Sequence, residues 1–129
     1  MEWYYVERDM RSVTEMKLYS LLQSFVTYAN TQYHLEPLLP RFERAVCFIF
    51  QDERYSLKIS RDKIELTNGA LGTEELVCFR EDDLQLLITG QVRLQSLLRR
   101  KAITYRGTYQ TMLLLESVFH ICKPLRVGA

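Results

Sequence analysis

Cysteine and histidine are the residues of this chain that most often carry metal, redox or nucleophilic chemistry. The three thiols, Cys47, Cys78 and Cys122, lack the close spacing of a metal knuckle or a redox pair. His34 and His120 belong to no recognisable motif, and the sequence has neither a glycine-rich phosphate loop nor a G-x-S-x-G nucleophile. We therefore expect buried free thiols, no metal, no cofactor and no enzymatic activity.

The composition excludes several classes of protein. The chain has 129 residues, 47% of them hydrophobic, and a formal net charge of +1 at pH 7. This length suits one globular domain, and the apolar content excludes overall disorder. A nucleic-acid partner is disfavoured because phosphate binding usually needs a basic excess. No apolar run approaches the roughly 20 residues of a membrane span, and Met1 to Tyr5 does not resemble a signal peptide, so we expect a cytoplasmic protein.

The first element along the chain that could position a site is expected to be a helix. Apolar residues follow helical spacing from Leu18 to Tyr33, behind the candidate N-caps Ser12 and Thr14, and Pro37 limits the helix. The flanking parts of the single domain are expected to be an N-terminal arm, residues 1–11, and a C-terminal tail, residues 123–129.

From Arg44 the period of the pattern changes to two, which predicts a sheet. Residues 45–50 are apolar on both alternations, as in a central strand covered on both faces. The polar residues 51–54 predict a hairpin loop, so the first three strands should form a meander. The expected strands are residues 45–50, 55–59, 63–67, 75–79 and 103–106.

Three further helical segments follow. The first is a helix over residues 84–88, with acidic residues at its start (81–83) and Gly90 after its end. The second is a short helix from Leu94 to Arg99. The last helix runs from about Thr108 to Cys122. The element order predicts an α+β fold, with helices on one face of a five-stranded, mostly antiparallel sheet.

The last helix is apolar nearly all the way round, so one sheet beneath it cannot cover it. Three kinds of cover remain open at this point. They are ordinary core from another helix, a partner subunit, and an apolar ligand held between helix and sheet.

Several segments resemble the sterol carrier protein type-two family. Residues 81–90 are similar to the acidic, leucine-rich, glycine-ended helix that follows the fourth strand in that family. Residues 94–98 resemble its next short helix, and residues 102–107 its last strand, which ends in glycine before an apolar terminal helix. The meander of residues 46–67 fits its strand order, so the resemblance covers roughly residues 13–122.

The resemblance implies a five-stranded sheet with an apolar tunnel beneath its helices, which would hold sterols, fatty acids, phospholipids or acyl chains without chemistry. The sequence departs from the family at two places. Arg100 and Lys101 stand where the family often has Gln-Gly, and residues 52–54 replace a glycine-containing first hairpin.

We therefore predict non-enzymatic binding or carriage of an apolar or amphipathic ligand, such as a lipid, fatty acid or sterol-like compound. Each expected lining residue is equally well explained as ordinary core. The expected lining residues are Phe48, Phe50, Leu57, Leu86, Leu94, Ile103, Tyr105, Met112, Leu115 and Phe119.

The polar handle of the site is expected from Tyr105 or Arg100. The basic run Arg99 to Lys101 is either a solvated helix end or a group of cations that attracts an anionic head group or membrane surface. The alternative function is a protein-protein interaction module or homodimer that uses the terminal helix and the aromatic arm at Trp3 to Tyr5.

Overall fold

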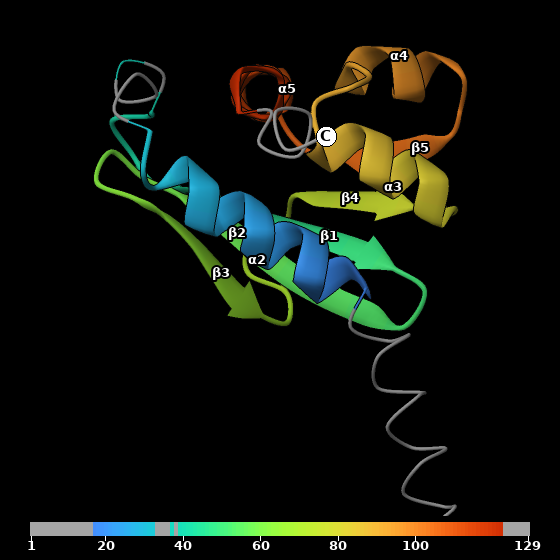
Figure 1. Cartoon of the computed structure of the whole chain (residues 1–129), viewed down its shortest axis with the longest axis horizontal. Coiled ribbons are helices and arrows are strands. Elements are labelled where there is room, and N and C mark those ends of the chain that lie inside the picture. The colour runs from blue at the N-terminus through green and yellow to red at the C-terminus, as the bar shows by residue number, and fades with distance from the viewer. Residues whose placement is uncertain (1–16, 33–36, 38, 123–129) are drawn as a thin grey trace, which may run out of the picture.

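The computed structural model describes residues 17–32, 37 and 39–122 of the chain. The described residues form one five-stranded sheet in the order β3-β2-β1-β4-β5, with the helices on one side of it (Figure 1). The strands are β1 (Arg44–Phe50), β2 (Glu53–Ile59), β3 (Ile64–Asn68), β4 (Glu75–Cys78) and β5 (Ile103–Arg106), and the helices are α2 (Lys17–Ala29), α3 (Glu81–Ile88), α4 (Leu94–Arg99) and α5 (Tyr109–Ile121).

The sheet contains the predicted meander. Strand β1 pairs antiparallel with β2, and β2 pairs antiparallel with β3. Strand β4 then pairs parallel with β1 and antiparallel with β5, so the sheet is mixed and mostly antiparallel. The α+β prediction is confirmed, and β1 takes the central position that its apolar sequence indicates.

Helix α2 follows the predicted apolar face. Its buried residues include Leu18, Leu22 and Phe25, which recur at helical spacing against the sheet. The expected caps Ser12 and Thr14, and Tyr33, lie outside the described residues. The expected arm with Trp3 to Tyr5, the tail at 123–129 and His34 also lie outside them.

The later elements agree with the predictions to within a few residues. Helix α3 begins at Glu81 and ends before Gly90, which has a φ of +74°. Helix α4 has the predicted bounds, and α5 lies between its caps Thr108 and Cys122. The fourth strand is shorter than expected, because β4 ends at Cys78 and Phe79 is 58% exposed.

The hairpin between β1 and β2 differs from the prediction of a polar loop over residues 51–54. Only Gln51 and Asp52 form the turn, with Gln51 at a φ of +55°. Glu53 and Arg54 already belong to β2, and Glu53 is only 6% exposed. The prediction was wrong because a two-residue turn suffices to join antiparallel strands, and the buried carboxylate has partners that local sequence cannot show.

Candidate ligand-binding site

The inner face of the sheet carries a row of side chains from β1 beneath the helices. Alternate residues of a strand point to the same face, so this row is Arg44, Val46, Phe48 and Phe50. Its three apolar members are at most 2% exposed. Leu57 of β2, the register partner of Val46, is fully buried beside them. Phe48, Phe50 and Leu57, all predicted as lining, are thus brought together.

Helix α5 contributes the opposite wall. Met112, Leu115 and Phe119 recur at helical spacing and are buried. The ring of Phe119 lies 6.0 Å from that of Phe48 in an edge-on arrangement and 4.7 Å from that of Phe25 of α2. Sheet, α5 and α2 therefore meet through three aromatic rings, one pair edge-on and the other tilted, and such contacts add to the effect of their burial.

The remaining predicted lining residues divide into two groups. Leu94 and Ile103 are buried within the same hydrophobic cluster, and Tyr105 is half-buried against it. Leu86 is only half-buried and is not among the described side chains of that cluster. It lies on α3 beside Leu87, which is fully buried, so the helix turns Leu86 away from the interior.

Arg100, the predicted head-group cation, lies at the end of the sheet where β5 begins. Ile103 pairs with Cys78, which pairs with Phe50 at the end of β1. Arg100 is exposed, and its guanidinium has no hydrogen bond or ion pair within the part of the chain that the structure describes. Tyr105, the other predicted polar handle, is separated from it along β5.

A polar cluster lies at the opposite end of the sheet, where β1 and α5 both begin. The guanidinium of Arg44 donates to the side-chain oxygens of Thr111, at 3.2 Å, and Gln110, at 3.4 Å. Thr111 is fully buried, and its hydroxyl is 2.9 Å from that of Thr108, the N-cap of α5. This cluster combines one cation with neutral hydrogen-bonding groups at the edge of the apolar interior, and its member Thr108 also donates to the carboxylate of Glu74.

Tyr105 borders this cluster. Burial and the nearby Glu74 carboxylate raise its pKa to about 12, against weaker effects of Thr111 and Arg44. The Tyr105 hydroxyl is therefore neutral near pH 7 and donates to the carbonyl oxygen of Thr108, at 2.9 Å. The neighbouring Gly107 is required by this packing, because a Cβ there would lie 2.5 Å from the hydroxyl oxygen.

Two carboxylates, the buried Glu53 and the half-buried Glu116, hold helices on this scaffold. Glu53 of β2 accepts hydrogen bonds from the backbone N–H groups of Leu18, at 3.1 Å, and Tyr19, at 3.2 Å. It thereby satisfies free donors in the first turn of α2, where a negative charge is favourable. Helix α4 has a similar arrangement, because Glu116 of α5 accepts from the backbone and side-chain nitrogens of Gln95.

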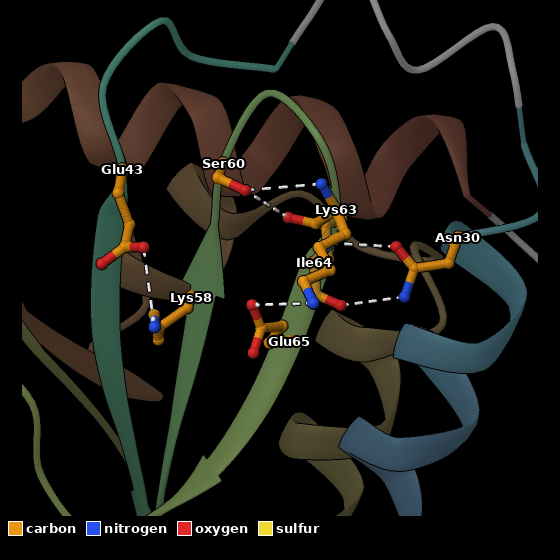
Figure 2. Close-up of polar contacts among 7 residues, drawn as sticks. All are labelled: Asn30, Glu43, Lys58, Ser60, Lys63, Ile64 and Glu65. Atoms are coloured by element: carbon orange, nitrogen blue, oxygen red, sulfur yellow. Dashed lines mark hydrogen bonds and ion pairs between the residues drawn. The ribbon is translucent and has the colours of Figure 1, made fainter.

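Asn30 fixes the other end of α2 to the edge strand β3. Figure 2 shows its amide pairing with the backbone of Ile64, donating to the carbonyl oxygen at 2.8 Å and accepting from the N–H at 2.9 Å. The same view shows the ion pairs of Lys58 with Glu43 and of Lys63 with Glu65. Helix α2 is thus held by polar contacts near both of its described ends.

The three thiols are free and buried, as predicted. Burial, with a smaller effect of Asp83, raises the pKa of Cys78 to about 12, and burial raises that of Cys122 to about 11. Burial is also the largest cause of the raised pKa of Cys47. Such thiols are protonated near pH 7 and are poor nucleophiles.

Sequence reasoning missed Arg44, Glu53, Glu74 and Glu116 as residues with a defined place in the structure. A signal for the first two was present in the strand alternation. Arg44 shares its parity with Val46, and Glu53 shares its parity with Leu57, so both should have been assigned to the inner face. No local pattern pointed to the partners of Glu74 or Glu116.

Within the described residues, no three His, Cys, Asp or Glu side chains gather as a metal site requires. None of the described helices combines the length and apolar content needed to span a bilayer.

The fold is similar to solved structures of sterol carrier proteins. The sterol carrier protein domain 2 of Helicoverpa armigera has a TM-score of 0.62 and 13% identity, over 84% of this chain and 90% of its own. The ubiquinone synthesis protein UbiJ-SCP2 has a TM-score of 0.58 and 14% identity, over 87% and 93%. Sterol Carrier Protein 2 Like 2 of Aedes aegypti has a TM-score of 0.51 and 11% identity, over 80% and 96%.

These similarities establish the fold, and the resemblance noted in the sequence is confirmed at that level. No family model matches the sequence, and no curated protein is significantly similar to it.

Proposed function

We propose that this chain binds or carries an apolar or amphipathic small molecule between its sheet and its helices, without catalysing a reaction. The ligand class is a lipid, a fatty acid or a sterol-like compound. The observation that carries the proposal is the fold shared with proteins named as sterol carriers and with a ubiquinone synthesis protein. Sterols and ubiquinone are both largely apolar molecules.

The inner layer of the chain supports the same proposal. Ligand sites of this kind are lined mainly by apolar and aromatic side chains, with a few polar groups at defined places. We propose that the ligand contacts Phe48 and Phe50 of β1 and Met112, Leu115 and Phe119 of α5. These side chains share one hydrophobic cluster, with the Tyr105 hydroxyl at its border. Leu57, Leu94 and Ile103 complete the proposed lining.

The test uses the full chain in two measurements. Native mass spectrometry of protein purified from cells should detect a co-purified lipid. After delipidation, titration with hexadecanoate, hexadecanol and cholesterol should show saturable binding of at least one ligand, at about one molecule per chain. Failure of all three to bind, together with a lipid-free mass, would refute the proposal.

A matched pair of substitutions on α5 locates the site. Met112→Trp adds bulk between helix and sheet, so it should weaken binding by about tenfold, whereas Ile121→Trp adds the same bulk at a position that is 39% exposed. Thermal unfolding must first show that both variants are folded. Equal affinities of the two variants would contradict the proposed place of the ligand.

The alternative function, an interaction module or homodimer, stays a prediction. Phe119 of the terminal helix is 2% exposed within the single chain, whereas Ile121 is 39% exposed. The aromatic arm at Trp3 to Tyr5 lies outside the described residues. The molecular mass in solution at micromolar concentration tests the homodimer, because a monomer would contradict it.

A further inference from the structure

Arg44 stands at the end of an otherwise apolar row. It is the first residue of β1 and shares the inner face with Val46, Phe48 and Phe50. The row extends for about 20 Å, since it covers six steps of roughly 3.3 Å. It thus passes from one cation to three buried apolar side chains, which is the polarity pattern of a single-chain amphiphile with a charged head.

The partners of Arg44 leave its charge uncompensated. Its guanidinium donates to two side chains, at the neutral oxygens of Thr111 and Gln110. Among the described residues, no carboxylate oxygen lies within ion-pair distance of its guanidinium. The nearby Glu74 instead accepts from the backbone N–H and the hydroxyl of Thr108, at 2.9 and 3.0 Å.

A half-buried arginine without an ion-paired carboxylate can still bind an anion. Guanidinium has five N–H donors, of which two are used here. Partial burial removes water from the charge, so an anionic partner is more favourable there than at a fully exposed arginine. Its planar donors match the two oxygens of a carboxylate. A monoanion suits the site better than a phosphate dianion, because the site offers one cation and the Glu74 carboxylate already lies on Thr108.

We propose that Arg44, with the side chains of Thr111 and Gln110, binds the carboxylate head group of a long-chain ligand whose apolar tail lies along the inner row of β1. This inference rests on the proposed function and names its ligand class and its selectivity. The chain therefore discriminates a fatty acid from a neutral molecule of equal length. The exposed run at Arg99 to Lys101 does not contribute to this selectivity.

The test compares two ligands and two arginines. Delipidated full-length protein is titrated with hexadecanoate and hexadecanol, and each affinity is measured by displacement of the neutral fluorophore diphenylhexatriene. Arg44→Gln should weaken hexadecanoate binding about tenfold, the loss expected for a charge-assisted hydrogen bond, and leave hexadecanol within about twofold. Arg100→Gln, the matched control, should leave both affinities unchanged.

Other results would overturn the inference. An equal loss for both ligands in Arg44→Gln would assign Arg44 a structural role. No loss in that variant, or a selective loss in Arg100→Gln, would place the head group elsewhere. If wild-type protein binds hexadecanol and hexadecanoate with no preference, this inference fails while the proposed function stands. If it binds neither of them and no sterol, the proposed function fails as well.

A measurement on wild-type protein keeps the inference testable if Arg44→Gln does not fold. Raising salt from about 0.05 M to about 0.5 M screens a partly exposed charge pair. The ratio of the hexadecanoate to the hexadecanol affinity should then fall about threefold. A ratio that does not respond to salt would contradict an ionic head-group contact.

Discussion

Arg44 and Arg100 lie at opposite ends of the same sheet, and their surroundings differ. Arg44 is half-buried, belongs to the inner face and donates to two side chains of α5. Arg100 is exposed, and water can solvate its charge fully. The run of cations thus lies on an exposed surface, whereas the single cation at the end of the apolar row is the one to which we assign the carboxylate of the ligand.

The two ends of the sheet also differ in the packing and the conformation of their backbone. At the end where Arg44 lies, Gly107 is closely surrounded by Tyr105 and Glu74. At the other end, Lys101 has a φ of +59°, a left-handed conformation that favours glycine. Its N–H donates to the carbonyl oxygen of Leu98, at 3.0 Å, in the turn that ends α4. One end is closely packed, and the other is strained but open.

The largest expected effect comes from removing the buried carboxylate near the Arg100 end. Glu53→Ala leaves two backbone N–H groups of α2 without their acceptor and should lower the free energy of unfolding by about 3 kcal/mol. Urea denaturation measures the change. Glu65→Ala, which removes a half-buried strand carboxylate paired with the exposed Lys63, is the control and should cost less than about 0.5 kcal/mol. Equal losses would show that Glu53 does not hold α2.

The packing difference predicts a smaller effect at the Arg44 end. Gly107→Ala should lower the free energy of unfolding by about 2 kcal/mol, because its Cβ would lie 2.5 Å from the Tyr105 hydroxyl oxygen. In the Tyr105→Ala background, which lacks both that oxygen and the ring carbon Cζ that lies 2.8 Å from the same Cβ, the loss should be clearly smaller. Additive losses in the double-mutant cycle would contradict the close contact.

The pH dependence of stability at high pH tests the burial of the Cys78 thiol in β4. The pKa of Cys78 is raised from 9.0 to about 12 by burial, so the unfolded chain loses this proton first. The stability that the protonated thiol contributes is present below pH 9 and is lost as pH rises toward 12. From about pH 9.5 to about pH 10.5, the free energy of unfolding should fall by about 1.2 kcal/mol from this group.

The same experiment has an internal control. Cys78→Ala should reduce the slope of stability against pH while leaving the contribution of Cys122, whose pKa is about 11. An unchanged slope in Cys78→Ala would mean that the Cys78 thiol does not titrate as its burial indicates.

The smallest effect is a gain in stability at the strained turn. Lys101→Gly should raise the free energy of unfolding by about 1 kcal/mol, because glycine adopts the left-handed conformation without steric cost. Lys101→Ala removes the same charge but keeps the strain, so it should produce little change. A similar gain in both variants would attribute the effect to charge repulsion instead.

The fold was largely predictable because its signals are local. The change from helical to alternating spacing at Arg44 located the meander, and the bounds of α4 followed from sequence alone. The parallel pairing of β1 with β4 was not predicted, since it joins segments that are distant in sequence. Strand pairing of this kind depends on tertiary packing and not on local propensity.

The candidate site was less predictable than the fold. The run of three basic residues led to the prediction of Arg100 as the head-group cation. Arg44 is a single cation, and its hydrogen-bond partners lie on α5, whose position the sequence does not show. Glu53 was assigned to a loop because it lies in a polar run, although its carboxylate is buried. The placement of Leu86 depends on the rotation of α3, which is set by packing around Leu84 and Leu87.

The distant carboxylates also constrain the order in which the chain can fold as it is synthesised. The acceptor for the Leu18 N–H is 35 residues later in the chain, and the acceptor for the Gln95 N–H is 21 residues later. A helix of 13 residues such as α2 is marginal by itself in water. While the ribosome has delivered α2 but not yet β2, the helix therefore lacks its acceptor and its apolar partner. Its stable formation must wait for the sheet that it covers.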